Sequence, residues 1–285
     1  MDSIESFFLE IFMLYLTKKC WWIMDFIAAK KSLGQNFLKD ESVLSKIANS
    51  FEVTEKDLII EIGPGKGALT KYFAKKKCDV ICYELDERMI PVLKQYESDH
   101  LIIKYQDFLK TNLLEDIKKD YQHIYVIANI PYYITTPILE HIMKSPIVID
   151  GLTLLVQKEV AVRFAAKPKT KDYGYFTVYL SHLYDVEYLF SVPARAFVPA
   201  PKVESAVVRL KRKSDIVNLE IEQFQKFAKL AFQQKRKTLK NNLKNYSWDT
   251  ISQVLIENGY SENVRSEELS YEMFLLLFKT LNQKN

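Results

Sequence analysis

Four consecutive residues, Asn129-Ile130-Pro131-Tyr132, combine three groups that could hold a flat ring bearing an amine. They follow an apolar run, residues 123–128, that is typical of a buried strand. The amide oxygen of Asn129 and the carbonyl of Pro131 can each accept a hydrogen bond from an exocyclic amine, and the Tyr132 ring offers a face for stacking. These contacts suit the N6 amine of adenine. Asn-Pro-Tyr sequences also form ordinary turns, so the motif alone does not decide the function.

A glycine-rich loop lies upstream, in Glu61-Ile62-Gly63-Pro64-Gly65-Lys66-Gly67. The chain has only 7 Gly in 285 residues, so three of them in one loop after the apolar run 58–62 indicate a local requirement. Glycines at such a place let the backbone turn from a strand into a helix and approach a ligand closely. The spacing differs from the Gly-X-Gly-X-X-Gly of dinucleotide-binding loops, and no Gly-Lys-Ser/Thr follows as in a phosphate-binding P-loop.

Two acids close the next two strand-like runs. Glu84 follows residues 79–83 and could accept hydrogen bonds from both ribose hydroxyls of an adenosine. Asp107 follows residues 101–105 and could accept from the adenine amine of a nucleoside cofactor. Together with the glycine loop and Asn129, they would stand at the ends of four successive strands, where open α/β sheets bind ligands. This set fits S-adenosylmethionine better than NAD.

Four motifs stand in order along the chain: Lys31-Ser-Leu-Gly-Gln-Asn-Phe-Leu38, Glu61-Ile-Gly-Pro-Gly65, Asn129-Ile-Pro-Tyr132 and Pro199-Ala-Pro-Lys-Val-Glu-Ser-Ala-Val-Val-Arg-Leu210. They resemble those of the ribosomal RNA adenine dimethyltransferases, above all the small-subunit (16S-type) enzymes. The resemblance covers about residues 26–280, and the family commonly has Leu where this chain has Ile130. It implies S-adenosylmethionine-dependent N6,N6-dimethylation of adenines, two adjacent ones near the 3′ end of small-subunit ribosomal RNA, with a role in subunit biogenesis.

The resemblance also implies roles for particular residues. Asn129, Pro131 and Tyr132 would act on the target adenine. Phe197 is the candidate for a second stacking face, although a core aromatic explains it equally well. The residues expected to bind the cofactor are Asn36, Leu38, Gly63, Gly65, Glu84, Asp107 and Asn129.

Two other functions stay open. A macrolide-resistance-type 23S rRNA adenine methyltransferase shares the fold and the Asn-Ile-Pro-Tyr form. The segments 31–38 and 199–205 favour the small-subunit enzyme instead. A non-catalytic ribosome-assembly or RNA-binding factor on the same fold is the second alternative. The intact Gly63, Glu84, Asp107 and Asn129 argue against such a loss of chemistry.

The order of elements predicts an α/β protein with a second, helical part. Alternating strands and helices indicate a parallel, doubly wound sheet. Residues 177–192 and 203–210 read as an antiparallel pair at its edge, and the family resemblance implies the seven-stranded Rossmann-like sheet of class I methyltransferases. We therefore expect a non-catalytic extension over 1–24, a methyltransferase domain over 25–212 and a small all-helical domain over 213–285. Strands are expected at 57–62, 79–84, 101–105, 123–128 and 152–157, and helices near 67–76, 86–96, 112–119, 136–144 and 158–166.

Charge distribution points to a polyanionic partner. Residues 195–245 carry 13 Lys and Arg against 4 Asp and Glu, whereas the whole chain has a net charge of only +4. A basic region beside a nucleoside-type site suggests RNA. Within it, Lys235, Arg236 and Lys237 are the candidate phosphate contacts, although such a run can also be a solvated helix face.

The remaining features limit the class of protein. The four His are scattered and no Cys-X-X-Cys occurs, so no metal site is expected. Cys78 and Cys82 read as buried thiols of a reduced, intracellular protein. The apolar stretch in residues 4–16 is interrupted by Glu5 and Glu10, which makes it a poor signal peptide or membrane span. We expect a monomer that needs no membrane and acts in the cytoplasm, with an organellar location left open.

Overall fold

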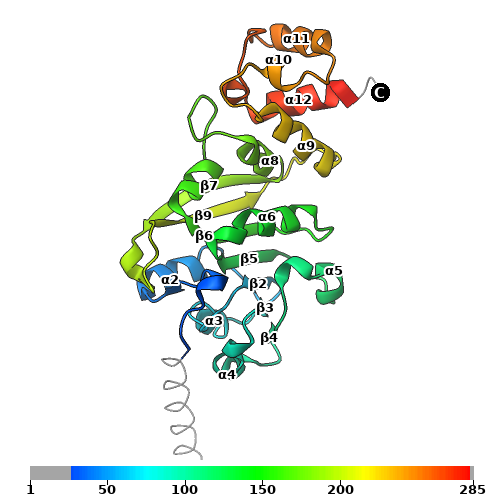
Figure 1. Cartoon of the computed structure of the whole chain (residues 1–285). Helices are drawn as coiled ribbons and strands as arrows, with labels where there is room; N and C mark the ends of the chain where they lie inside the picture. The colour runs from blue at the N-terminus through cyan, green and yellow to red at the C-terminus, as the bar shows by residue number, and fades with distance from the viewer. Residues whose placement is uncertain (1–26, 283–285) are drawn as a thin grey trace, which may run out of the picture.

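The computed structural model describes residues 27–282, so the expected extension over residues 1–24 lies outside the described part. A seven-stranded sheet forms the centre of this part, and a lobe of helices lies beyond one edge of it (Figure 1). The strands of the sheet are β2 (Leu58–Ile62), β3 (Asp79–Tyr83), β4 (Leu101–Lys104), β5 (Ile124–Asn129), β6 (Gly151–Gln157), β7 (Tyr184–Val192) and β9 (Ser205–Arg212). Two short strands, β1 (Phe37–Leu38) and β8 (Phe197–Val198), pair with each other outside it.

The sheet order is β4-β3-β2-β5-β6-β9-β7. The first five strands run parallel, whereas β9 is antiparallel to both of its neighbours, β6 and β7. This confirms the seven-stranded methyltransferase-like sheet with an antiparallel edge. The chain leaves β2 toward β3 and β4, and later returns to the other side of β2 with β5, so the order reverses between β2 and β5. Open α/β sheets bind ligands at such a reversal.

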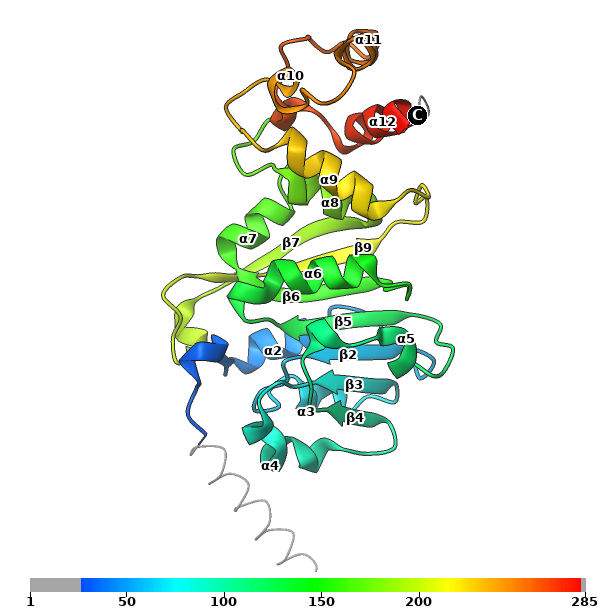
Figure 2. The same ribbon diagram turned by 45° about the vertical axis from the view of Figure 1, so that its right-hand side comes forward.

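Helices cover both faces of the sheet (Figure 2). Strand residues alternate between the faces, so Ile59 packs in one core with the first helices and Ile60 in the other core with the later ones. The helix before β2 starts at Asp40, whose carboxylate accepts from the backbone N–H groups of Ser42 and Val43. The helices are α2 (Glu41–Ala48), α3 (Thr70–Phe73), α4 (Ile90–Leu93), α5 (Leu113–Asp116), α6 (Thr135–Lys144), α7 (Lys158–Phe164), α8 (Tyr175–Leu183), α9 (Ile221–Ala231), α10 (Leu239–Asn242), α11 (Trp248–Glu257) and α12 (Tyr271–Asn282).

One expected strand is wrong in its first half. The expected strand over 177–192 includes most of the residues of α8, yet only β7 has that conformation. The run Thr177-Val178-Tyr179-Leu180 is rich in β-branched and aromatic residues, which favour strands. It is buried on nearly every side, between the sheet and the C-terminal helices, so it lacks the amphipathic period that identifies a surface helix. Burial on all sides, and not the intrinsic propensity of its residues, therefore determines that this segment is a helix.

The helices expected after β2, β3 and β4 exist but are shorter. A 3-10 turn precedes α4 and another follows it, and Pro91 stands at the start of α4. No helix among residues 27–282 is both long and apolar enough to cross a membrane.

Candidate active site

A cleft of about 1080 Å³ opens at the carboxyl ends of β2, β3, β4 and β5. The loops after these four strands line it, and so does the N-terminal segment around β1. The cleft therefore lies where the sheet order reverses. It brings together nine of the residues that the sequence assigned to cofactor or adenine: Asn36, Leu38, Gly63, Gly65, Glu84, Asp107, Asn129, Pro131 and Tyr132.

The glycine loop turns sharply at the end of β2. Gly63 has φ +70° and Gly65 has φ +55°, a left-handed conformation that residues with a Cβ rarely adopt. In the described part of the chain, the only atom that a Cβ on Gly63 would meet within 4 Å is the carbonyl oxygen of Asn129, at 3.9 Å. The glycine is thus required by its backbone conformation and leaves open space over the loop, as a closely approaching ligand needs.

Glu84 lies at the end of β3 and is only 5% exposed. Its Oε2 accepts from the backbone N–H of Gly65 at 2.8 Å, and its Oε1 accepts from that of Asp86 at 2.8 Å. Burial raises the pKa of this carboxyl, and the charge of Asp86 adds to the shift, whereas the backbone N–H donors of Asp86, Gly65 and Leu85 oppose it. Each oxygen keeps a lone pair beyond its backbone partner, so the carboxylate can also accept from the two hydroxyls of a ribose.

Asp107 caps the short turn after β4. Its Oδ1 accepts from the backbone N–H of Leu109 at 3.0 Å. Among the described residues its Oδ2 has no hydrogen-bond partner and is free to accept from an amine. Phe108, buried beside it, also lines the cleft. An acceptor next to an apolar surface is what an adenine ring requires.

Asn129 ends β5 with a defined orientation of its amide. The Nδ2 atom donates to the backbone carbonyl of Asn36 at 3.3 Å. Because a carbonyl can only accept, the nitrogen must be the atom that faces Asn36. The Oδ1 atom is therefore left to accept from a substrate amine.

The two residues after Ile130 are also held in place. The carbonyl of Pro131 accepts from the N–H of Ile134 at 3.1 Å, so one of its two lone pairs is already used and the other remains. The hydroxyl of Tyr132 is 2.6 Å from Oγ of Ser205, a buried residue at the start of β9. This contact fixes the ring of Tyr132 against the cleft, and burial raises the pKa of its hydroxyl.

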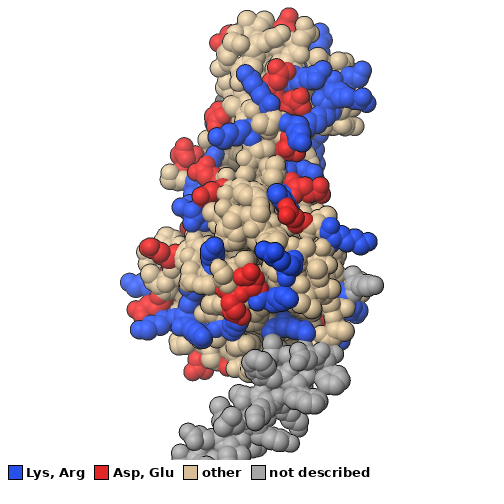
Figure 3. Space-filling model, turned by 90° about the vertical axis from the view of Figure 1, so that its left-hand side faces the viewer, with Lys and Arg blue, Asp and Glu red and all other residues tan. Residues whose placement is uncertain are grey.

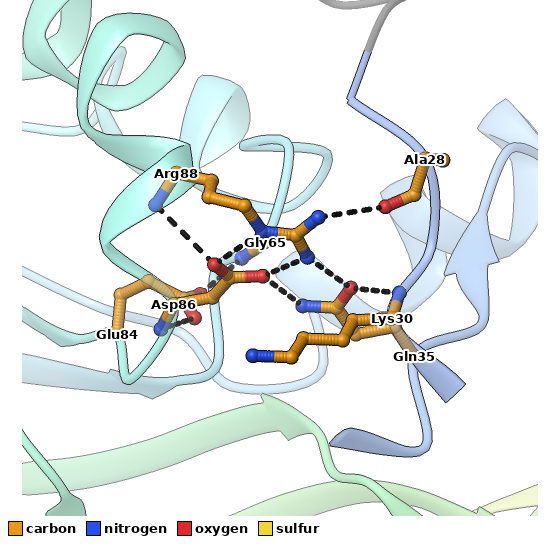
Figure 4. Close-up of polar contacts among 7 residues, drawn as sticks. All are labelled: Ala28, Lys30, Gln35, Gly65, Glu84, Asp86 and Arg88. Atoms are coloured by element: carbon orange, nitrogen blue, oxygen red, sulfur yellow. Dashed lines mark hydrogen bonds and ion pairs between the residues drawn. The ribbon is translucent and has the colours of Figure 1, made fainter. Parts of the chain in front are cut away.

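A polar network that the sequence did not reveal fastens the N-terminal segment over the cleft (Figure 4). Asp86 accepts from Gln35 Nε2 at 2.8 Å and from Arg88, whose Nε lies 2.8 Å from Oδ1. Arg88 also donates to the carbonyl of Ala28 at 3.3 Å, and Gln35 Oε1 accepts from the N–H of Lys30 at 2.8 Å. Hydrogen bonds from Arg88 lower the pKa of Asp86 to about 2.

Since Asp86 also donates its N–H to Glu84, the segment is tied to the acid at the end of β3. Gln35 and Asp86 are 51 residues apart, and no local pattern links them.

A buried acid beneath the glycine loop is a second feature that the sequence did not reveal. Glu61 is 1% exposed and accepts from Thr70 Oγ1 at 2.7 Å. Burial raises the pKa of its carboxyl to about 8.

The other assigned residues lie outside the cleft. Phe197 is 2% exposed and packs in the core, where β8 pairs with β1 and sets Phe197 opposite Leu38. This placement favours the core interpretation. Lys235, Arg236 and Lys237 are exposed between α9 and α10 in the helical lobe. Cys78 and Cys82 are buried free thiols, and within residues 27–282 no group of three or more His, Cys, Asp or Glu could hold a metal ion.

Comparison with known proteins identifies relatives of this chain. The family model described as ribosomal RNA adenine dimethylase matches residues 27–283. The chain is 41% identical over 265 residues to ribosomal RNA small subunit methyltransferase A of Bacillus cytotoxicus, covering 88% of this chain and 91% of that protein. It is 42% identical over 256 residues to the protein of the same name in Mycoplasmopsis synoviae, covering 89% and 97%.

Two crystal structures share the architecture. A dimethyladenosine transferase from Plasmodium falciparum matches with a TM-score of 0.73 and 25% identity, over 87% of this chain and 98% of that one. The 23S rRNA methyltransferase ErmE matches with a TM-score of 0.66 and 27% identity, over 87% and 100%.

Proposed function

Because the chain belongs to the ribosomal RNA adenine dimethylase family, we propose that it dimethylates N6 of adenines in small-subunit ribosomal RNA. Methyl transfer from S-adenosylmethionine to ribosomal RNA adenine is the reaction of this family. The small subunit as the target is supported by relatives about 40% identical that are named for it. Two adjacent adenines near the 3′ end of a 16S-type RNA, and a part in subunit biogenesis, are the finer form of the proposal.

The residues of the cleft fit the cofactor. The lone pairs left on Glu84 suit a ribose, the free Oδ2 of Asp107 suits an adenine amine, and the open space over Gly63 admits close approach. Asn36 and Leu38 border the same space from the N-terminal segment. When bound, S-adenosylmethionine supplies a methyl group on a positively charged sulfur.

The single observation that carries the proposal is the orientation of Asn129. Its Oδ1 and the remaining lone pair of Pro131 can accept both N6 protons of a target adenine. The lone pair of this nitrogen is normally delocalised into the ring, and two such bonds favour a geometry in which it is available. Holding the methyl donor and the adenine nitrogen in line can lower the activation barrier by roughly 7–11 kcal/mol. Stacking on Tyr132 would add about 1–3 kcal/mol to holding a flipped or single-stranded base.

We further propose that two parts of the chain have different roles. Residues 25–212 would carry the chemistry, and residues 213–285 would bind ribosomal RNA, with Lys235, Arg236 and Lys237 on its phosphates. The proposed working form is a monomer in the cytoplasm.

The test compares ribosomal particles. Purified protein with tritiated S-adenosylmethionine is offered small subunits lacking this modification and, separately, large subunits, and the products are mapped by primer extension and mass spectrometry. We expect N6,N6-dimethyladenine in the small-subunit RNA alone. Methylation of 23S RNA instead would support the macrolide-resistance-type activity of the ErmE-like alternative. Binding without transfer to either would support an assembly factor.

A further inference from the structure

Two lysine-rich segments that are far apart in the sequence lie side by side. One is the loop 165–174 between α7 and α8, with Lys167, Lys169 and Lys171 exposed. The other is the exposed run 235–237 between α9 and α10. The ammonium group of Lys235 donates to the backbone carbonyl of Lys171. In Figures 1 and 2 the loop reaches up from the sheet to the helical lobe.

The lobe holds the loop in this position. The backbone N–H of Lys169 donates to the carbonyl of Glu267 at 2.7 Å, and Lys169 has φ +67°, an unusual value for a residue with a side chain. Tyr173, only 3% exposed, packs edge-on against Phe232, with ring centroids 5.9 Å apart. Phe232 in turn stacks on Phe274 of α12 at 5.4 Å. The loop is thus fastened at its middle and at its end.

The combined surface is strongly cationic. Lys167, Lys169, Lys171 and the run 235–237 give six positive side chains, against one acid in the two segments, Asp172. Within residues 27–282 none of the six forms an ion pair with a carboxylate. Figure 3 shows Lys and Arg side chains gathered over the helical lobe. Clustered like charges repel one another, and a polyanion relieves that repulsion.

Helix α7 leads from the end of the sheet where the cleft opens toward the helical lobe (Figure 2). Asn129 in β5 pairs with Leu155 in β6, and α7 begins directly after β6. The loop follows the seven residues of α7, which extend about 10 Å. An RNA strand whose adenine occupies the cleft can therefore continue along α7 to the cations.

We propose that loop 165–174 forms one phosphate-binding surface with the run 235–237, and that Lys167, Lys169 and Lys171 contact the sugar-phosphate backbone of the ribosomal RNA substrate. The RNA-binding surface then spans the junction between sheet and lobe and is not confined to the helical part. This inference rests on the proposed function, since it takes the substrate to be the same RNA.

The experiment measures how RNA affinity depends on salt. Small subunits lacking the modification are titrated with wild-type protein, with a Lys167→Gln/Lys169→Gln/Lys171→Gln variant, and with a control variant at several KCl concentrations. The control, Lys56→Gln/Lys75→Gln/Lys77→Gln, removes the same charge from three exposed lysines that precede β2 and β3, at the opposite end of the strands from the cleft.

The slope of log K against log salt is negative, and removing one phosphate contact reduces its magnitude by about 0.7 for single-stranded and 0.9 for duplex nucleic acid. The slope of the loop variant should therefore be less steep than that of the wild type, by about 2 to 3 in magnitude. A Lys235→Gln/Arg236→Gln/Lys237→Gln variant should show the same reduction, whereas the control keeps the wild-type slope. Binding of S-adenosylhomocysteine, measured by calorimetry, should be unchanged in all three variants and shows that each is folded.

Loop and control variants with the same slope would overturn the inference while leaving the proposed function intact. A wild-type protein that neither binds nor methylates small subunits would instead overturn the proposed function. The two failures are therefore distinguishable.

Discussion

Asn129 is the residue on which the proposed chemistry depends, because its Oδ1 is turned toward the substrate side by the bond from Nδ2 to Asn36. We expect Asn129→Ala to lower kcat at saturating RNA by a factor of about 100 or more, about 3 kcal/mol, since the hydrogen bond from the adenine amine acts mainly in the transition state. Cofactor affinity, measured by calorimetry, should change little. Near-normal turnover of this variant would contradict the assigned role.

Replacing Glu84 should mainly lower the affinity for the cofactor, in contrast to the replacement of Asn129, which should mainly lower kcat. A hydrogen bond to a charged acceptor is worth about 1.5–3 kcal/mol, so Glu84→Ala should weaken cofactor binding by roughly 10- to 150-fold. The substitution also removes the acceptor for Gly65 N–H, so thermal unfolding of the variant is followed as a control. Unchanged calorimetric affinity for S-adenosylhomocysteine would rule out the ribose contact.

At the residue scale, the sequence predicts what lies at the ends of strands. Gly63, Glu84, Asp107 and Asn129 each follow an apolar run, and parallel strands end at one edge of a sheet, so their convergence could be anticipated. The roles of Asp86 and Arg88 could not be anticipated. Their partners come from a segment about 50 residues upstream, and only the fold brings them together.

At the scale of elements, the N-terminal segment is held over the cleft by the side chain of Arg88. We expect Arg88→Met to raise the KM for cofactor about 2- to 10-fold with kcat nearly unchanged, because the segment 28–36 closes less firmly over the bound cofactor. The effect is modest, since the Arg88 side chain is 45% exposed and its charge is screened.

Two further variants sharpen this test. Arg88→Lys keeps the charge and should restore part of the affinity. Lys229→Met breaks an exposed ion pair with Glu140 away from the cleft and should leave the KM unchanged. A fall in kcat alone for Arg88→Met, with an unaltered KM, would contradict the role in closure.

Helix α8 marks the limit of prediction at this scale. The strands β2, β3, β4 and β5 are predictable to within about two residues, because each is an apolar run between turn residues. The composition of α8 favours a strand, and the burial of this helix between two other layers is a tertiary property that no local pattern carries. Phe197 shows the same limit, since an aromatic side chain in the core and one on a binding surface look alike in a sequence.

At the scale of the whole molecule, a buried histidine in α8, the helix between the sheet and the C-terminal helices, contacts a residue of the helical lobe. His182 in α8 is 3% exposed, and its Nδ1 lies 3.0 Å from the hydroxyl of Tyr271 in α12. Burial, together with nearby Lys213 and Arg212, lowers the pKa of His182 to about 4. The ordinary value of about 6.5 applies to the unfolded chain, so between about pH 6.5 and 4 the unfolded state binds the proton first.

The contribution of this group to the free energy of unfolding should therefore be complete above about pH 6.5. It should be lost as the pH drops toward 4, by an amount on the order of 3 kcal/mol. Urea unfolding at a series of pH values measures it. A His182→Gln variant keeps a polar partner for Tyr271 and should show a flatter dependence over this range. Parallel curves for the two proteins would contradict the assignment to His182.

The apolar core that runs from Ile60 in β2 through Tyr179 in α8 to Phe274 in α12 has a geometric consequence. The catalytic cleft and the basic lobe share one packed interior, and packed interiors deform little. The distance from Asn129 to the run 235–237 should then change little. If this run holds RNA phosphates, as we propose, an adenine is accepted only when its own RNA places phosphates at that distance, so the target would be selected by distance as well as by base identity.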